Sequence, residues 1–276
     1  MMKAPLIYLF FLLFAFNFSA EDFSHEEQRM LSTLYVQTAA EHRASVLQTF
    51  KTATNLLPEA IEDASWNALP NLASRDRDLA PAIIIDVDDT VLDNSPYEAR
   101  LIKSGQSYPS GWGDWCNESQ AKPLPGVLEF LLKAEQMGVK IFYVTNRKYE
   151  YEKGTLENFK KFGIPIEGDE DSLLMRYENG WDSNKTSRRE LIAKNHRVIF
   201  QIGDNLGDFV DLSLSHQSPE KRVEVVTEFN DMWGKYWFMI ENPTYGDWEG
   251  ALYKFNFDRS NQEIIQIRNK KLDEAR

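Results

Sequence analysis

The feature of this sequence that most restricts its fold is a series of short apolar runs separated by stretches with helical periodicity. A continuous apolar run is typical of a strand that is buried on both faces of a sheet. Strands that alternate with helices predict an α/β fold with a parallel sheet covered on both faces. The predicted strands are 82–87, 139–144, 198–202, 223–226 and 237–240, and the predicted helices include 127–137, 150–162 and 185–194.

The segments around these runs divide the chain. Residues 24–65 place apolar side chains such as Leu31, Leu34 and Tyr35 at helical spacing, which predicts two or three helices. The insert at about 95–122 is rich in Gly, Pro and aromatic residues and has neither period, so we expect a loop or a cap. We therefore predict a helical lead-in over 21–80, packed with the cap region, and an α/β core over 81–276.

The first twenty residues resemble a leader. Lys3 precedes the apolar run Leu6–Phe16, which would rise only about 16 Å as a helix and is too short to span a bilayer core. This pattern predicts a signal peptide over 1–20 and export to the periplasm or the medium, with an uncleaved membrane anchor as the alternative. No cysteine follows the run, so a lipid anchor on an N-terminal cysteine is not evident.

Composition excludes several classes of function. The chain has 276 residues, enough for one or two domains, with 31 Lys and Arg against 43 Asp and Glu and a net charge of −12. Such a surface repels phosphate backbones, so we expect no nucleic-acid polymer as a partner. Cys116 is the only cysteine, which excludes an intramolecular disulfide and a zinc site built from several thiolates.

Polar clusters follow three of the predicted strands. Asp86 and Asp88 follow the first, Thr145 and Asn146 the second, and 203–208 (GDNLGD) the third. Each cluster has a structural alternative, because aspartate often caps a helix and GDN is ordinary turn chemistry. Ligands of open α/β sheets bind beyond the carboxyl ends of the strands, so the three clusters together favour a functional site.

The residue types in these clusters indicate phosphoryl transfer. Carboxylates brought together repel one another unless a cation holds them, and an all-oxygen ligand set suits magnesium above all. Magnesium lets a phosphate dianion approach an acidic site. A carboxylate is also a competent nucleophile toward phosphorus, and a second acid two residues on can protonate the leaving oxygen.

These residues resemble the class C, or four-aspartate, acid phosphatases of the haloacid dehalogenase (HAD) superfamily, and the sequence is similar to the bacterial lipoprotein 5′-nucleotidases among them. The matching segments are 86–97 (DVDDTVLDNSPY), 199–209 (IFQIGDNLGDF), 144–147 (VTNR), Lys185 with Arg188 and Arg189, 242–250 (NPTYGDWEG), 37–41 (QTAAE) and 65–69 (SWNAL). Two departures are Asp89, where the family usually has Glu, and the missing lipid-anchor cysteine. The resemblance implies a HAD-like doubly wound parallel sheet with a helical N-terminal extension and a small cap insert.

The resemblance also implies residue roles. Asp86 would be the nucleophile and Asp88 the acid and base. Magnesium would be held by the Asp86 carboxylate, the Asp88 backbone carbonyl and Asp204, with Asp208 acting through bound water. The phosphoryl oxygens would be held by Thr145, Asn146 and Lys185.

Trp112 and Tyr245 match aromatic residues that sandwich the ring of the substrate in this family. The alternative is that they only pack in the fold. The expected partner is a small phosphomonoester, such as a nucleoside 5′-monophosphate or an aryl phosphate, with monomer and homodimer left open.

The expected function is therefore an exported, magnesium-dependent acid phosphatase. The alternative is a non-catalytic binding or storage protein on the same fold, like the plant storage relatives that lack the nucleophilic aspartate. Asp86 and Asp88 are both present here, which favours the enzyme. An intracellular phosphotransferase is disfavoured by the predicted leader.

Overall fold

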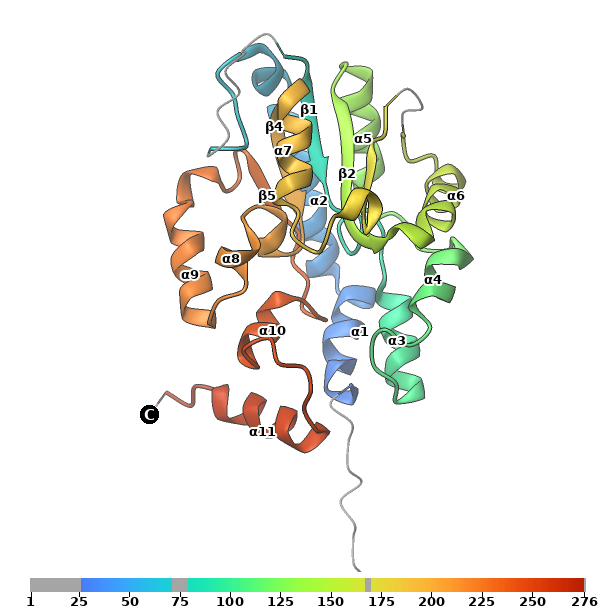
Figure 1. Ribbon diagram of the computed structural model, residues 1–276, viewed down its shortest axis with the longest axis vertical. Helices are drawn as coiled ribbons and strands as arrows, with labels where there is room; N and C mark the ends of the chain where they lie inside the picture. The colour runs from blue at the N-terminus through green and yellow to red at the C-terminus, as the bar shows by residue number, and fades with distance from the viewer. Residues whose placement is uncertain (1–25, 71–78, 167–169, 276) are drawn as a thin grey trace, which may run out of the picture.

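A five-stranded parallel sheet forms the centre of the computed structural model, which describes residues 26–70, 79–166 and 170–275 (Figure 1). The predicted signal peptide lies outside the described residues. The strand order is β3-β2-β1-β4-β5, so the direction of winding reverses between β1 and β4. The strands are β1 (Pro81–Ile85), β2 (Lys140–Lys148), β3 (Leu173–Arg176), β4 (Arg197–Gly203) and β5 (Trp237–Met239).

The sequence of β1 explains its central place. Ile83 and Ile85 pack into the core on one face of the sheet, whereas Ala82 and Ile84 pack into a second core on the other face. Successive side chains of a strand point to opposite faces, so a strand covered on both sides must be apolar at every position. The predicted doubly wound α/β fold is confirmed.

Helices cover both faces of this sheet and gather beyond the carboxyl ends of its strands. Helices α2 and α5 pack together on one face, and α7 packs against β2 and β4. Figure 1 shows α1, α3, α10 and α11 below the sheet. The helices are η1 (Glu27–Arg29), α1 (Met30–Thr38), α2 (Ala40–Glu62), α3 (Ser95–Ser104), α4 (Trp112–Glu118), α5 (Val127–Gln136), η2 (Tyr149–Tyr151), α6 (Glu152–Phe162), η3 (Glu178–Gly180), α7 (Thr186–Asn195), η4 (Leu206–Asp208), α8 (Leu212–Ser215), α9 (Pro219–Glu228), η5 (Asn230–Met232), α10 (Asp247–Leu252) and α11 (Asn261–Lys271).

The lead-in is bonded directly to the sheet. The Trp66 indole donates to the carbonyl oxygen of Ile199 in β4 at 2.9 Å. Arg197, the first residue of β4, donates to the Ala60 and Ile61 carbonyls in the last turn of α2, at 2.8 Å each. These bonds satisfy carbonyls that the end of a helix leaves without partners. Helix α2 is therefore part of the core rather than an appended unit.

The predicted lead-in helices are confirmed as η1, α1 and α2. The apolar residues that predicted α1 nevertheless lie on its exposed face and not in the core: Leu31, Leu34 and Tyr35. No helix within the described residues is both long and apolar enough to cross a membrane.

The structure differs from the apolar patterning at one predicted strand and adds detail at two other places. Residues 223–226 belong to helix α9, which begins after Ser218 with Pro219 in its first turn, and Val223 is 65% exposed. The short strand β3, Leu173–Arg176, was not predicted. The insert at 95–122 contains helices α3 and α4 rather than irregular loop alone.

Candidate phosphoryl-transfer site

The sheet brings three aspartates together where its winding reverses. Asp86 follows β1, and its backbone N–H donates to Ile202 of the neighbouring β4 at 2.9 Å. Asp204 directly follows β4, and Asp208 comes from the adjacent turn η4. One carboxylate oxygen from each of the three lies within 4.8 Å of the other two. This is the part of an α/β sheet where ligands bind, and the carboxylates form a cluster that could hold a metal ion.

The turn after β4 depends on a glycine. A Cβ atom at Gly203 would lie 2.3 Å from Oδ2 of Asp208, far inside van der Waals contact. That same oxygen accepts a hydrogen bond from the backbone N–H of Asn205 at 2.9 Å, so Asp208 closes the turn. The GDNLGD sequence therefore folds Asp208 back beside Asp204.

Within the described residues, Lys185 is the cation that bonds to the carboxylates of this cluster. Lys185 is buried and donates hydrogen bonds to Oδ1 of Asp86 and, at 2.6 Å, to Oδ1 of Asp208. Burial, together with the charges of Asp208 and Asp88, raises the pKa of Asp86 to about 7, although Lys185 acts in the opposite direction. Burial and the neighbouring carboxylates also raise the pKa of Asp204. Three carboxylates and one lysine leave negative charge that an additional cation would balance.

Asp88 lies in the turn that follows β1, and its carboxylate has hydrogen-bonding partners outside the aspartate cluster. Its Oδ1 accepts from Asn94 Nδ2 at 2.7 Å and from Arg147 Nε at 2.9 Å, and its Oδ2 accepts from the Thr145 hydroxyl at 3.3 Å. Its neighbour Asp89 has φ of +50°. The Asp89 carboxylate accepts from the backbone N–H of Asn94, which holds this turn closed.

The predicted phosphate-binding residues differ in how freely their side chains can reach a ligand. Thr145 is buried beside Asp88, and Lys185 lies within the aspartate cluster. Asn146 is exposed, but its amide donates to Ser183 and accepts from Arg188 at 2.8 Å. Phosphate binding by these three residues stays a prediction.

Two arginines of α7 support the loops around the site. Arg188 donates to the Thr145 carbonyl at 2.6 Å, and Arg189 donates to the Asp208 carbonyl at 2.8 Å. Burial lowers the pKa of each to about 10. The sequence resemblance included both residues without giving them a role. The structure places Arg188 against the carboxyl-terminal part of β2 and Arg189 against the turn that follows β4.

Trp112 of the insert packs among other aromatic side chains and an arginine. Trp112 is only 9% exposed, with Tyr97 and Tyr108 against its ring edges and the Arg147 guanidinium 5.6 Å from its ring centroid. Tyr108 is 57% exposed. Its ring contacts Trp112, which lies against Arg147, and Arg147 in turn bonds to Asp88.

Tyr245 is tied to the same turn as Asp88. Its hydroxyl donates to Oδ2 of Asp89 at 2.5 Å. Ring stacking by Trp112 and Tyr245 stays a prediction. Tyr108 was missed, since a single tyrosine in an irregular insert carries no periodic signal.

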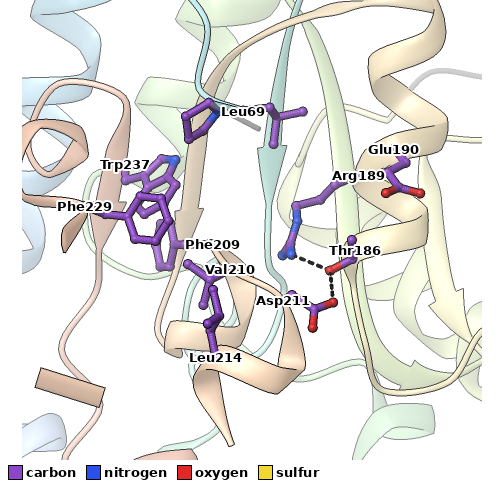
Figure 2. Close-up of a pocket in the computed structure, with 11 residues that line it drawn as sticks. Leu69, Thr186, Arg189, Glu190, Phe209, Val210, Asp211, Leu214, Phe229 and Trp237 are labelled. Atoms are coloured by element: carbon purple, nitrogen blue, oxygen red, sulfur yellow. Dashed lines mark hydrogen bonds between the residues drawn. The ribbon is translucent and has the colours of Figure 1, made fainter. Parts of the chain in front are cut away.

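A separate pocket lies on the α7–α9 side of the sheet (Figure 2). It has a volume of about 250 Å³, with Phe209, Phe229 and Trp237 on one wall and Arg189 and Asp211 on another. Arg189 and Asp211 are joined through the Thr186 hydroxyl, to which Arg189 donates at 3.0 Å and which donates to Asp211 at 2.9 Å. None of the three clustered aspartates lines this pocket, so it is distinct from the candidate site.

Comparison with known proteins places these features in one family. Residues 20–248 match the model of the HAD superfamily, subfamily IIIB (acid phosphatase). The structure is similar to the class C acid phosphatase from Bacillus anthracis, with 35% identity and a TM-score of 0.79 over 91% of this chain and 99% of that chain. A second structure of that phosphatase has tungstate bound.

Curated plant proteins match part of the chain. Acid phosphatase 1 of Solanum lycopersicum is 25% identical over 49% of this chain and 54% of its own length. Vegetative storage protein 1 of Arabidopsis thaliana is 24% identical over 46% of this chain and 48% of its own length. The chain thus spans about half the length of the curated relatives it matches, and they include both an acid phosphatase and a storage protein.

Proposed function

Because this chain belongs to the HAD subfamily IIIB acid phosphatases, we propose that it hydrolyses small phosphomonoesters with Asp86 as the nucleophile. The observation that carries this proposal is the placement of Asp86. It lies where the winding of the sheet reverses, bonded to Lys185 and beside Asp204 and Asp208. The tetrahedral oxyanion tungstate, bound in a structure of the Bacillus anthracis phosphatase, supports a site shaped for phosphate.

The residues present fit a divalent cation, for which we propose Mg²⁺. Asp86, Asp204 and Asp208 offer oxygen ligands that lie within 4.8 Å of one another, and hard cations prefer such ligands. The Asp88 backbone carbonyl is the further ligand that the family resemblance implies. Bound Mg²⁺ would neutralise charge on the phosphoryl group and let the dianion approach the carboxylates.

The chain's own residues then account for two transfer steps. In the first, an Asp86 carboxylate oxygen bonds to phosphorus, the bond to the leaving oxygen breaks, and Asp88 gives that oxygen a proton. In the second, water bonds to phosphorus and gives a proton to Asp88, and the bond between Asp86 and phosphorus breaks. Lys185 and Thr145 would hold phosphoryl oxygens during both steps.

Substrates with a flat ring fit the approach to this site best. Tyr108 offers an exposed ring that contacts Trp112, which lies against Arg147, the partner of Asp88. Tyr245 lies beside the turn after β1 through its bond to Asp89. Stacking of a base on an aromatic side chain is worth on the order of 1–3 kcal/mol. We therefore propose nucleoside 5′-monophosphates and aryl phosphates as preferred substrates.

Export is part of the same proposal and rests on the leader over residues 1–20. The storage alternative is supported by the match to the Arabidopsis thaliana protein. It is disfavoured by the presence of Asp86 and Asp88 with the hydrogen-bonding partners that a nucleophile and an acid need. The homodimer stays a prediction.

Phosphate release from a panel of monoesters tests the proposal. We expect hydrolysis of nucleoside 5′-monophosphates, phenyl phosphate and, more slowly, glycerol phosphate when Mg²⁺ is present. EDTA should abolish release from all three, and added Mg²⁺ should restore it, because the carboxylate cluster repels the dianion without a cation. No release from any ester, or release that EDTA does not change, would contradict the proposal.

Tyr108→Ala, assayed with the same panel, tests the ring contact. We expect kcat/KM for the nucleotide and the phenyl ester to fall about 5- to 100-fold, from the loss of stacking. Glycerol phosphate has no ring and serves as the internal control, so its kcat/KM should change little. Equal losses on all esters would mean that Tyr108 only supports the fold.

A further inference from the structure

The Asp88 carboxylate is held asymmetrically. Its Oδ1 accepts from Asn94 Nδ2 at 2.7 Å and Arg147 Nε at 2.9 Å, and Arg147 Nη2 lies 2.9 Å from the same oxygen. Within the described residues, its Oδ2 accepts one hydrogen bond, from the Thr145 hydroxyl at the long distance of 3.3 Å. Oδ1 is therefore surrounded by N–H donors, and Oδ2 is the oxygen left to meet a substrate.

Arg147 is itself fixed on several sides. Its side chain is 1% exposed, its Nη1 donates to the Thr155 hydroxyl of α6 at 3.1 Å, and its guanidinium lies over the ring of Trp112 in α4. A guanidinium is planar and always charged, so three anchored sides leave it almost no freedom to turn. Its position beside Asp88 is thus set by the insert and by α6.

Asn94 is oriented by an equally specific contact. The Trp115 indole donates to Oδ1 of Asn94 at 2.9 Å, and both groups are buried. Because indole N–H can only donate, it selects the carbonyl end of the amide and turns the NH₂ group toward Asp88. The donors on both sides of Oδ1 are therefore held from the insert.

We propose that Arg147, together with Asn94, is a positioning residue that orients Asp88 so that Oδ2 exchanges the proton with the leaving oxygen. The inference rests on the proposed phosphatase function and gives a role to Arg147, which the sequence resemblance included without one. A general acid that donates its proton in one direction acts faster when its orientation is fixed. General acid–base catalysis contributes about 10²- to 10⁴-fold to the rate of such reactions. Without Arg147, the carboxylate can rotate and present either oxygen.

The test compares two aryl phosphates whose leaving phenols differ in acidity. The phenolate that leaves phenyl phosphate is basic and needs a proton from the general acid. The p-nitrophenolate that leaves p-nitrophenyl phosphate is a delocalised anion and needs little protonation. In Arg147→Met, assayed with Mg²⁺, we expect the ratio of kcat/KM for phenyl to p-nitrophenyl phosphate to fall at least about tenfold. A loss of stacking would lower both values alike and leave the ratio unchanged.

Arg100→Met is the matched control. Arg100 also lies over a tryptophan of the insert, 5.0 Å from the Trp115 ring centroid, and pairs with Glu118 at 2.7 Å, but its pairing carboxylate is not Asp88. We expect the wild-type ratio in this variant. Thermal unfolding of every variant separates folding from chemistry.

Arg147→Lys covers the case in which Arg147→Met does not fold. Lysine keeps the charge but not the planar fork, so we expect a ratio at least about threefold below wild type. A wild-type ratio in whichever variant folds, or equal losses on both esters, would overturn the positioning role alone. An inactive wild-type enzyme would instead refute the proposed function.

Discussion

Two clusters of buried carboxylates in this molecule are balanced differently. The aspartate cluster is formed by Asp86, Asp204 and Asp208, and within the described residues its carboxylates bond to one cation, Lys185. The glutamate cluster joins the start of the described chain with α3, α10 and α11, which lie below the sheet in Figure 1. It consists of Glu26, Glu98, Glu249, Arg29 and Arg268.

The glutamate cluster joins segments that are far apart in sequence. Arg29 lies 2.8 Å from Glu249 of α10 and 3.6 Å from Glu98 of α3, and Arg268 of α11 lies 2.6 Å from Glu249. Two arginines thus face three carboxylates, and Tyr253 donates a further hydrogen bond to Glu249 at 3.0 Å. The charges are nearly compensated by the chain itself, which is the arrangement expected of a structural network.

The comparison shows how a binding site differs from a structural ion network. Both clusters are buried and both are anionic, so burial and charge alone do not separate them. The aspartate cluster keeps carboxylate oxygens close together around a single lysine, whereas the glutamate cluster places a guanidinium between its carboxylates. Only the aspartate cluster therefore gains from an added cation.

The largest expected effect is the loss of turnover in Asp86→Asn. The amide cannot form a bond to phosphorus, while its oxygen can still accept from Lys185, so kcat should fall at least about a hundredfold with the fold intact. Glu249→Gln is the control from the other cluster, and it should keep near wild-type kcat. Steady-state kinetics with circular dichroism checks both, and more than a few per cent activity in Asp86→Asn would exclude Asp86 as the nucleophile.

The second prediction concerns metal-dependent stability. Mg²⁺ at about 100 times its Kd should stabilise the folded protein by about 2.7 kcal/mol, which raises Tm by about 5 °C. Asp204→Asn should remove most of this shift, because it takes one of the three clustered carboxylates. Glu249→Gln should lower the starting Tm and keep the shift. Differential scanning calorimetry measures these values, and a full shift in Asp204→Asn would show that Mg²⁺ binds elsewhere.

The smallest expected effect comes from Glu98. Burial, against the opposing charge of Arg29, raises its pKa from 4.5 to about 7. A carboxyl group with a raised folded-state pKa stabilises the fold below its unfolded pKa, and that stability is lost as pH rises through the folded value. Between about pH 4.5 and 7, Glu98 should therefore cost on the order of 1–3 kcal/mol of unfolding free energy.

Glu98→Gln tests this by thermal unfolding across that pH range with Mg²⁺ present. The variant should show a flatter dependence of Tm on pH than wild type. Glu129→Gln, on the exposed face of α5, should leave the dependence unchanged. An unchanged slope in Glu98→Gln would mean that Arg29 keeps Glu98 ionised throughout.

Parts of the fold and site were readable in the sequence because they depend on local patterns. The run that forms β1 must be apolar throughout, since its side chains enter the cores on both faces. The apolar run at 223–226 misled for the same local reason: a short run fits a strand or a helix equally well, and here Ser218 and Pro219 begin a helix. The edge strand β3 was not predicted, although the still shorter edge strand β5 was.

The sequence by itself determined the alternation of strands and helices and the residue types that follow the buried strands, because ligands of a parallel sheet bind beyond the carboxyl ends of its strands. Only the tertiary structure decided which side chains meet there. The contacts of Arg147 with Asp88, of Trp115 with Asn94 and of Tyr245 with Asp89 join residues 59, 21 and 156 positions apart. Such pairings depend on how the insert and the C-terminal segment pack over the strand ends, and no local periodicity encodes that packing.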